Sequence, residues 1–268
     1  MAVSLGNQLF SPGLQRYFSV LYVLTLRNLK IRYRGSILGV YWSLLNPMIM
    51  TGIYTAIFGQ AFTAYYDHSL LNYLLAAFTG LVVTNFFVAS TSQALTSVVS
   101  NGALLNKIQV PMSVFPLSMI AANLFQFSVG SLPLLAVATL WITHNPLHLL
   151  LLPLPILELL LTCTGIGLLI GTLYVFFRDL PYFYELITFA LWISSPVFYP
   201  AAIVPEQVRA FLVLNPLWPI IEGLRQVVLS DQMPDFGMMG LGLLSSTLIC
   251  AIGCFCFLRW REAFMDLL

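Results

Sequence analysis

Charged residues are scarce in this 268-residue chain, where they make up 8% of the sequence and hydrophobic residues make up 59%. A typical water-soluble domain carries about 25% charged residues, and the mean hydropathy here is +0.91. A soluble fold of this length could not cover so much apolar surface, so lipid must be the solvent for much of it. The sequence therefore predicts a membrane protein that crosses the bilayer several times.

The sequence also lacks the motifs of common catalytic and metal sites. It has no G-x-x-x-x-G-K-[ST] phosphate loop and no H-E-x-x-H pair. His68, His144 and His148 fall in predicted external loops, where we expect solvated or interfacial side chains rather than ligands. The few cysteines lie inside apolar runs, which favours small packing residues over a metal site. They are Cys163, Cys250, Cys254 and Cys256.

Six apolar stretches have about the 20 residues that a helix needs to cross a bilayer. The predicted spans are Tyr41–Phe62, Leu70–Leu95, Met112–Ile142, Ile156–Phe177, Tyr182–Tyr199 and Phe236–Leu258. The third is long enough to tilt, or to kink at Pro116 and Pro133. The residues from Met1 to Pro12 lack the basic and apolar regions of a signal peptide. We therefore expect the first apolar run to remain as a spanning helix.

The basic residues lie at every other connection between the predicted spans. Nine of the eleven precede the first span, follow the sixth, or fall between the second and third or the fourth and fifth. They are Arg16, Arg27, Lys30, Arg32, Arg34, Lys107, Arg178, Arg259 and Arg261. Cytoplasmic loops carry an excess of Lys and Arg. Both termini are therefore predicted to lie in the cytoplasm.

The apolar segment Ile203–Leu229 does not fit a single crossing, because that would place the C-terminal arginines outside. It contains Glu206, Arg209, Glu222 and Arg225, and prolines interrupt it. These features favour a re-entrant path from the outer side, or a segment along the outer interface. Glu222 and Arg225 are three residues apart and are expected to pair on a helix.

The fourth predicted span carries a carboxylate and several glycines. A carboxylate inside the membrane is a functional candidate, and Glu158 is the charged residue that lies well inside a span. A structural role, as a partner of Arg209 or Arg225, is the alternative. Small residues let membrane helices approach closely, and packing within one subunit is favoured here over a dimer contact. The glycines are Gly165, Gly167 and Gly171.

The basic stretch before the first span has the pattern of an interfacial helix. Arg16, Arg27, Lys30 and Arg34 are spaced 11, 3 and 4 residues apart, which keeps them in one sector of a helix. Aromatic and aliphatic side chains fall roughly opposite. This pattern predicts a helix in the headgroup layer, with its cations toward phosphate and water.

Two further segments suggest contacts with other molecules. The short connection Ser100–Pro111 mixes polar and apolar residues, so it is either a plain linker or a short helix that contacts a protein partner. Aromatic residues make up 14% of the chain, and Tyr54, Phe58 and Phe62 share one helix face. Lipid-facing belts explain most such residues. A wall that holds sugar rings without gripping them is the alternative.

Five stretches, in order, carry a resemblance to a known family. They are RNLKIRYRGSILGVYWSLLNP, NGALLNKIQVP, FFRDLPYF, SPVFYPAAIVP and LNPLWPIIEGLR. Together they resemble the transmembrane subunit of type-2 ATP-binding-cassette exporters, and most closely the branch that exports O antigen, capsule or teichoic acid. The similarity extends from about Tyr17 to Trp260.

The resemblance implies an all-α integral membrane fold, formed by one permease domain over residues 1–268. It implies six transmembrane helices, a cytoplasmic N-terminal interfacial helix at Leu14–Arg34, a coupling helix at Asn101–Val110 and external re-entrant helices at Pro200–Leu229. It also implies a homodimer that pairs with two separate ATPase subunits. Those subunits, and not this chain, would bind ATP and magnesium.

The resemblance also assigns roles to particular residues. It implies that an aromatic-lined canal forms between subunits, that the coupling helix docks on the ATPase, and that the re-entrant helices lie near the outer gate. The canal residues would be Tyr54, Phe58, Trp192, Phe198 and Tyr199. The coupling residues would be Asn101, Leu104, Leu105, Lys107 and Ile108, and the gate residues Glu158, Arg209, Glu222 and Arg225.

The expected function is export of a lipid-linked polysaccharide across the bacterial inner membrane by a transport subunit that is not itself an enzyme. Nucleic acid is not an expected partner. The alternatives are the same fold exporting a drug or small lipophile, an integral membrane glycosyl- or acyltransferase, and a membrane scaffold or channel.

Overall fold

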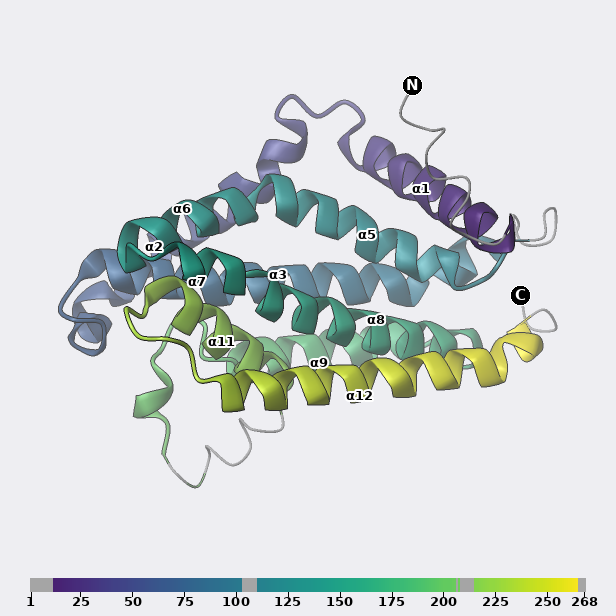
Figure 1. Ribbon diagram of the computed structural model, residues 1–268. Coiled ribbons are helices and arrows are strands. Elements are labelled where there is room, and N and C mark those ends of the chain that lie inside the picture. Colours follow the sequence, from purple (N-terminus) through teal and green to yellow (C-terminus); the bar gives the residue numbers. More distant parts are fainter. Residues whose placement is uncertain (1–11, 103–109, 206, 208–214, 265–268) are drawn as a thin grey trace.

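The computed structural model describes residues 12–102, 110–205, 207 and 215–264, and every regular element in these ranges is helical (Figure 1). Long helices form a bundle. The start of α1 and the end of α12 lie at one end of the bundle, which we call the near end. The α2–α3 connection and α7 lie at the opposite, far end. The all-helical architecture expected from the sequence is confirmed over these residues.

Each of the six predicted spans contains a helix, but the fifth, predicted at Tyr182–Tyr199, is helical only as far as Ser194. The α-helices are α1 (Pro12–Tyr33), α2 (Trp42–Phe62), α3 (Leu70–Ser100), α5 (Val114–Val129), α6 (Ser131–Thr143), α7 (Pro146–Leu151), α8 (Pro153–Phe176), α9 (Leu180–Ser194), α11 (Leu217–Leu229) and α12 (Phe236–Trp260). Short 3-10 turns occur at Gly39–Tyr41, Thr63–Tyr65, Ala201–Ile203 and Arg261–Ala263.

Within the described residues, three helical stretches are long and apolar enough to cross a membrane. They are Leu70–Ser100, Pro146–Phe176 and Phe236–Trp260. The pair α5 and α6 makes a fourth if it is counted as one bent span. The chain is therefore a multi-pass membrane protein.

The third predicted span bends at Gly130 rather than at either proline. The axes of α5 and α6 differ by 43°. Pro133 lies three residues beyond the bend, and its missing N–H cannot bond to the carbonyl of Val129, which weakens the helix at this point. Pro116 lies in the first turn of α5, where the N–H would have no helical partner in any case. The sequence thus identified the weak region, but the break itself falls on the glycine.

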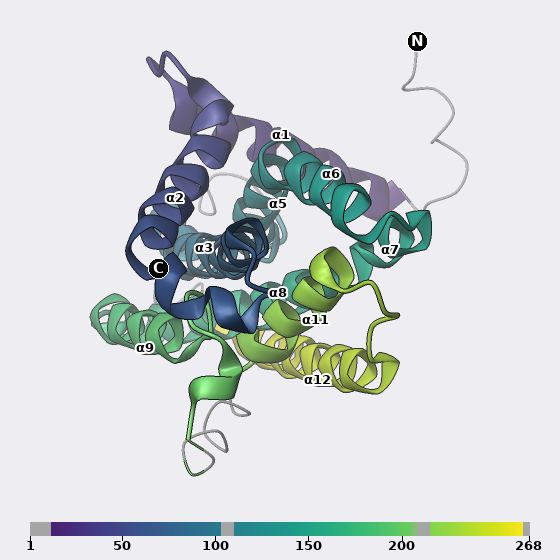
Figure 2. The ribbon, with the colours of Figure 1, turned by 90° about the vertical axis from the view of Figure 1, so that its left-hand side faces the viewer.

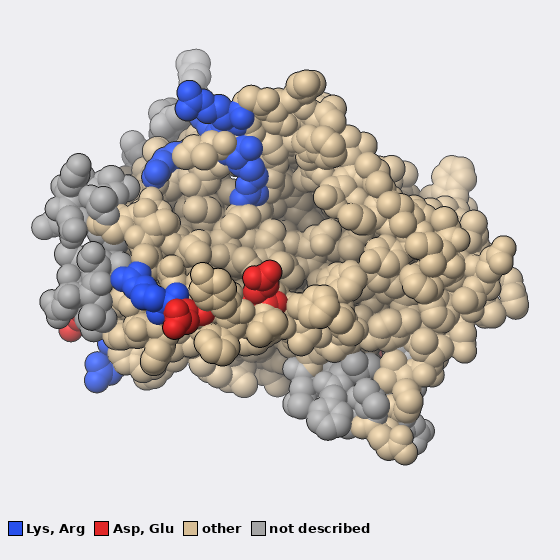
Figure 3. Space-filling model, turned by 180° about the vertical axis from the view of Figure 1, so that it is seen from behind, with Lys and Arg blue, Asp and Glu red and all other residues tan. Residues whose placement is uncertain are grey.

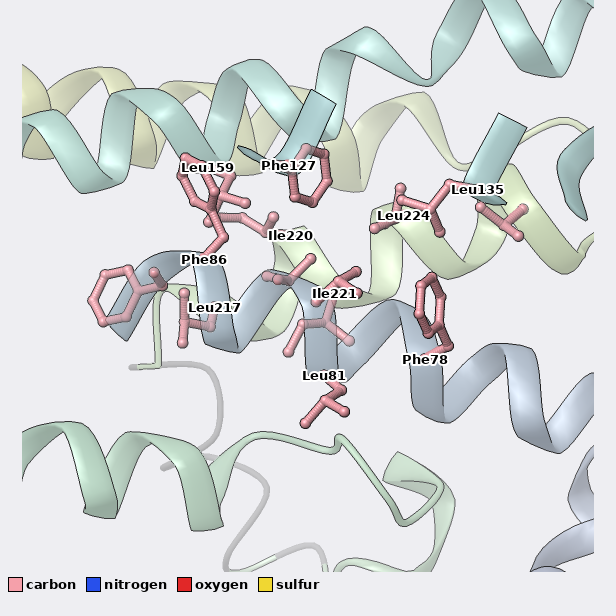
Figure 4. Close-up of a cluster of buried hydrophobic side chains, with 14 of the residues drawn as sticks. Phe78, Leu81, Phe86, Phe127, Leu135, Leu159, Leu217, Ile220, Ile221 and Leu224 are labelled. Atoms are coloured by element: carbon pink, nitrogen blue, oxygen red, sulfur yellow. The ribbon is translucent and has the colours of Figure 1, made fainter. Parts of the chain in front are cut away.

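The core lies between α3, α5, α6, α8 and α11 (Figure 4). Six apolar residues of α11 recur at the spacing of one helix face and are buried. They are Leu217, Ile220, Ile221, Leu224, Val227 and Val228. The helix α11 contacts α3, α6, α8 and α12. Therefore one face of α11 is packed into the core of the bundle.

Glycines allow α8 to approach two neighbours closely. A Cβ on Gly165 would collide with the backbone of Ile249 in α12, and a Cβ on Gly253 of α12 would collide with the backbone of Gly165. On another face of α8, a Cβ on Gly167 would come 3.0 Å from the Cβ of Ala94 in α3. These close approaches lie within one subunit, as the sequence favoured.

Candidate functional site

A continuous groove runs along one side of the bundle between α2 and α9. Figure 2 shows these helices standing apart on that side, with α3 set back between them. Three cavities line it: about 600 Å³ between α1, α2, α3 and α5, about 380 Å³ between α3 and α9, and about 270 Å³ between α2 and α9. The first two share Asn85 and Val88, and the last two share Trp192. We call the whole path the α2–α9 groove.

The cavity at the far end of the groove is lined mainly by aromatic rings. Tyr54 stacks on Phe198 with ring centroids 3.6 Å apart and on Phe58 at 6.1 Å, and Trp192 meets Phe198 edge-on at 5.8 Å. Tyr199 also lines this cavity. The five residues expected to line a canal therefore lie together, although they come from two segments of the chain that are more than one hundred residues apart.

The middle of the groove carries polar side chains that the sequence analysis did not single out. Asn85 is at the centre of α3, and it is exposed although the residues on both sides of it are buried. Glu185 of α9 is exposed in the same cavity. An amide or carboxylate inside an apolar run was the signal that could have marked them, because such groups are costly in lipid.

The cavity at the other end of the groove is built around Arg32, beside the last turn of α1 and the middle of α3 and α5, and we call it the near-end cavity. The cations Arg16, Arg27 and Lys30 are exposed on α1 and Arg34 is exposed just after it, whereas Arg32 turns inward. Its Nη1 donates to Asn123 Oδ1 at 2.8 Å. Further hydrogen bonds from its guanidinium reach the side-chain oxygens of Gln126 and Gln93.

The helix α1 packs along α5, which explains the inward turn of Arg32. Tyr17 Oη lies 3.1 Å from Ser113 Oγ, and Asn28 Nδ2 donates to Ser118 Oγ at 3.0 Å. Burial lowers the pKa of Arg32 from its ordinary value, but a guanidinium stays charged at neutral pH. Burial likewise raises the pKa of the neighbouring Tyr33, and the charge on Arg32 partly opposes that rise. Figure 3 shows this side of the molecule, hollowed beside a group of Lys and Arg side chains.

One of the predicted coupling residues, Asn101, is described. It follows the last turn of α3, and its Oδ1 accepts a hydrogen bond from Arg27 Nη1 of α1 at 3.3 Å. The structure thus joins α1 to the start of the predicted coupling helix. The other four, Leu104, Leu105, Lys107 and Ile108, lie outside the described residues.

Two predicted gate residues meet at the far end. Arg225 Nη1 and Glu222 Oε2 are 3.9 Å apart, so the expected pair forms. Arg225 also donates to Ala76 O at 3.1 Å, to Val197 O at 3.0 Å and to Pro196 O. Both residues line a cavity of about 340 Å³ with residues from the α2–α3 connection.

Glu158 does not partner Arg225, which corrects one of the pairings considered from the sequence. Its side chain is buried against Gly242 of α12, and its Oε1 has no hydrogen-bond partner among the described residues. Arg209, the other candidate partner, lies outside them.

One expected solvated histidine is instead buried. His148 is fully buried in α7, with Nδ1 3.1 Å from the carbonyl oxygen of Val227 in α11. The expectation of a solvated residue was wrong because α7 folds back onto α11 rather than forming an open loop. His68 and His144 are exposed, as expected.

Comparison with known proteins identifies the family. A family model described as ABC-2 type transporter matches residues 19–229, which is most of the chain. The chain belongs to the ABC-2 type transporter family. This ABC-2 chain is therefore a component of a transport system rather than an enzyme, as the resemblance implied.

The curated relatives of this ABC-2 chain carry a consistent name. It is 26% identical over 253 residues to an O-antigen export system permease protein RfbA of Klebsiella pneumoniae, covering 94% of this chain and 95% of that protein. It is 30% identical over 242 residues to the RfbA protein of Myxococcus xanthus, covering 89% and 91%. The similarity thus extends over nearly the whole length of both proteins.

Proposed function

We propose that this chain is the permease subunit of an ATP-driven exporter that moves a lipid-linked polysaccharide across the bacterial inner membrane. The α2–α9 groove carries the proposal, because it forms one continuous path from a polar, basic near end to an aromatic far end. The relatives named for O-antigen export support the class of substrate.

The aromatic cavity suits a sugar chain in transit. Rings such as Tyr54 and Trp192 present flat apolar faces, and such faces attract sugar rings without fixing their orientation. The polar residues Asn85 and Glu185 supply hydrogen bonds farther along the path. A moving polymer needs weak and repeated contacts of this kind.

We further propose a homodimer with six spans in each subunit and with the near end in the cytoplasm. The positions of the six helical regions and the near-end location of both the start of α1 and the end of α12 support this topology. The buried α11 supports a re-entrant segment within Pro200–Leu229. The whole chain, residues 1–268, is then one permease domain with an interfacial helix at Leu14–Arg34.

The proposed energy source is a separate ATPase subunit, two per complex, that holds ATP and magnesium. It would dock on Asn101–Val110. The hydrogen bond between Asn101 and Arg27 would carry its movement into α1, and from there into the near-end cavity at Arg32. Substitution of Leu104 or Lys107 is expected to weaken ATPase assembly.

The test is ATP hydrolysis by the purified complex, with and without lipid-linked glycan. Trp192→Ala and Tyr54→Ala should reduce glycan stimulation about threefold to tenfold, because one aromatic contact is worth about 0.5–1.5 kcal/mol. Trp141→Ala is the matched control, since Trp141 of α6 is exposed and does not line the aromatic cavity.

Other outcomes would redirect the proposal. Hydrolysis that responds to a small lipophile and not to glycan would favour a drug exporter. A chain that forms no complex with an ATPase, and that transfers sugar or acyl groups alone, would contradict the exporter.

A further inference from the structure

The near-end cavity holds a positive charge that no described carboxylate neutralises. The described contacts of the Arg32 guanidinium are to amide oxygens of Gln93, Asn123 and Gln126. Amide oxygens satisfy N–H groups but carry no net charge. The ion pair found among the described residues is Arg225 with Glu222, at the far end. Within the part of the chain that the structure describes, the charge on Arg32 is therefore held in place without a carboxylate partner.

The lining of the cavity also supplies no negative charge to compensate Arg32. Among the described residues that surround it, none is Asp or Glu. A charge that is withdrawn from water is costly unless an opposite charge compensates it. By contrast, the buried Arg225 has both a carboxylate and backbone carbonyls as partners. An anion in the near-end cavity would supply for Arg32 what Glu222 supplies for Arg225.

The cavity has the size and the donors for a phosphorylated group. Its volume of about 600 Å³ is within the range of sites for small molecules. Asn46 of α2 and Asn85 of α3 are exposed on its walls, and Ser43 and Ser131 add hydroxyl groups. The amides take three of the five N–H groups of Arg32, so the Nε–H and one Nη2–H remain to donate to phosphate oxygens. The three amide side chains fix the orientation of the guanidinium group before any ligand binds.

The location of the cavity relates the anion to the transported molecule. The cavity is at the near end of the α2–α9 groove and shares Asn85 and Val88 with the next cavity along it. A phosphate held there would leave the glycan attached to it directed along the groove. The apolar outer face of α2, with Ile49 and Ile53 exposed, lies beside it for a lipid tail.

We infer that Arg32, supported by Gln93, Asn123 and Gln126, binds the phosphate or diphosphate group that joins a glycan to its lipid. This inference rests on the proposed function for the identity of the molecule that bears the phosphate. The anion site itself rests on the charge and contacts of Arg32.

The test is calorimetric titration of the full chain in zwitterionic nanodiscs with farnesyl diphosphate, farnesol and inorganic diphosphate. Farnesyl diphosphate should bind, and Arg32→Gln should weaken its binding at least tenfold. Arg32→Lys keeps the positive charge but lacks the planar guanidinium, and should bind farnesyl diphosphate more tightly than Arg32→Gln and less tightly than the wild type. Arg34→Gln, which removes an exposed cation two residues away, should change the affinity less than twofold.

A second variant separates binding from folding. Asn46→Leu removes an amide on the cavity wall without touching the hydrogen bonds of Arg32, and should weaken farnesyl diphosphate severalfold. The phosphate site is overturned if farnesol binds as tightly as farnesyl diphosphate, or if Arg32→Gln binds as tightly as the wild type. Competition by inorganic diphosphate would show that the phosphate group alone suffices, whereas Arg32-dependent binding without such competition would assign the site to the lipid-borne group.

The two proposals can fail separately. Arg32-dependent binding of farnesyl diphosphate, combined with hydrolysis that ignores glycan, would keep the anion site and reject polysaccharide export. Glycan-stimulated hydrolysis that is equal in wild type and Arg32→Gln, with no diphosphate binding, would reject the site and keep the export function.

Discussion

Two inward-facing arginines, Arg225 buried and Arg32 partly buried, show how one residue type serves different purposes in this chain. Arg225 connects three segments, because it bonds to Ala76 of α3 and to Pro196 and Val197 after α9 while it pairs with Glu222 on its own helix. Arg32 has amide partners and an open cavity beside it. The contacts of Arg225 favour a structural role, and those of Arg32 favour a ligand.

Replacement of Arg225 should therefore destabilise the fold. In Arg225→Met, the backbone carbonyl of Val197 loses the donor from Arg225, that of Ala76 keeps its local donor from Thr79, and Glu222 loses its partner. Removal of one member of a buried charged network typically costs about 3–5 kcal/mol. We expect a clear fall in the thermal unfolding midpoint in detergent.

The matched control for Arg225 is Arg259→Met, at the exposed end of α12. Glu222→Gln should have a smaller effect, because that carboxylate is partly exposed and 3.9 Å from its partner, so the pair is worth about 0–1 kcal/mol. Equal unfolding midpoints for Arg225→Met and Arg259→Met would exclude the structural role.

Single residues were predicted from the sequence with mixed success, for physical reasons. The pair of Glu222 and Arg225 follows from helical spacing, which is local. The carbonyl partners of Arg225 lie 28 to 149 residues away in the sequence, so no spacing rule could find them. The inward turn of Arg32 depends on how α1 packs against α5, and its charge alone placed it with the exposed cations.

At the scale of helices, apolar runs were a reliable guide and packing was not. Each predicted span contains a helix, because an apolar run in lipid has to satisfy its backbone internally, although the helix in the fifth predicted span ends at Ser194. The position of the bend at Gly130 and the burial of α7 and α11 depend on neighbouring helices. The charges of the α11 region argued against a single crossing, but the packing of α11 into the core was visible only in the structure.

The contact between α8 and α12 gives a prediction for helix packing. In Gly253→Ala, the new methyl group would overlap the backbone of Gly165, which cannot move aside as a flexible side chain could. Overpacking of this kind costs about 1–3 kcal/mol. The unfolding midpoint of the purified chain should fall accordingly.

The same helix offers a control of identical chemistry. A Cβ on Gly240 would meet open space, so Gly240→Ala should leave stability unchanged or raise it slightly through helix propensity. If both alanine variants of α12 behave alike, the close approach of α8 and α12 is not as tight as described.

At the scale of the whole molecule, the two long sides of the bundle differ in what they expose. Between Phe236 and Leu258, α12 carries no charged or amide side chain, so its exposed face suits lipid. The opposite side exposes Asn85 and Glu185 along the α2–α9 groove. Exposing such groups to hydrocarbon is energetically costly, so we expect this side to be shielded from lipid. A second copy of the chain would shield it by enclosing the groove between two subunits.

This asymmetry predicts which side forms the proposed dimer. With the four native cysteines replaced by alanine, Ile57→Cys on α2 and Phe189→Cys on α9 should cross-link between subunits when a short bifunctional thiol reagent is added to membranes. Leu244→Cys on α12 should not, although its exposed fraction of 67% is close to the 64% of Ile57 and the 60% of Phe189. Equal exposure makes the three thiols comparable in reactivity, so the yield reports proximity. Efficient cross-linking through Leu244→Cys alone would place the interface on the lipid-compatible side, and Asn85 and Glu185 would then need another cover.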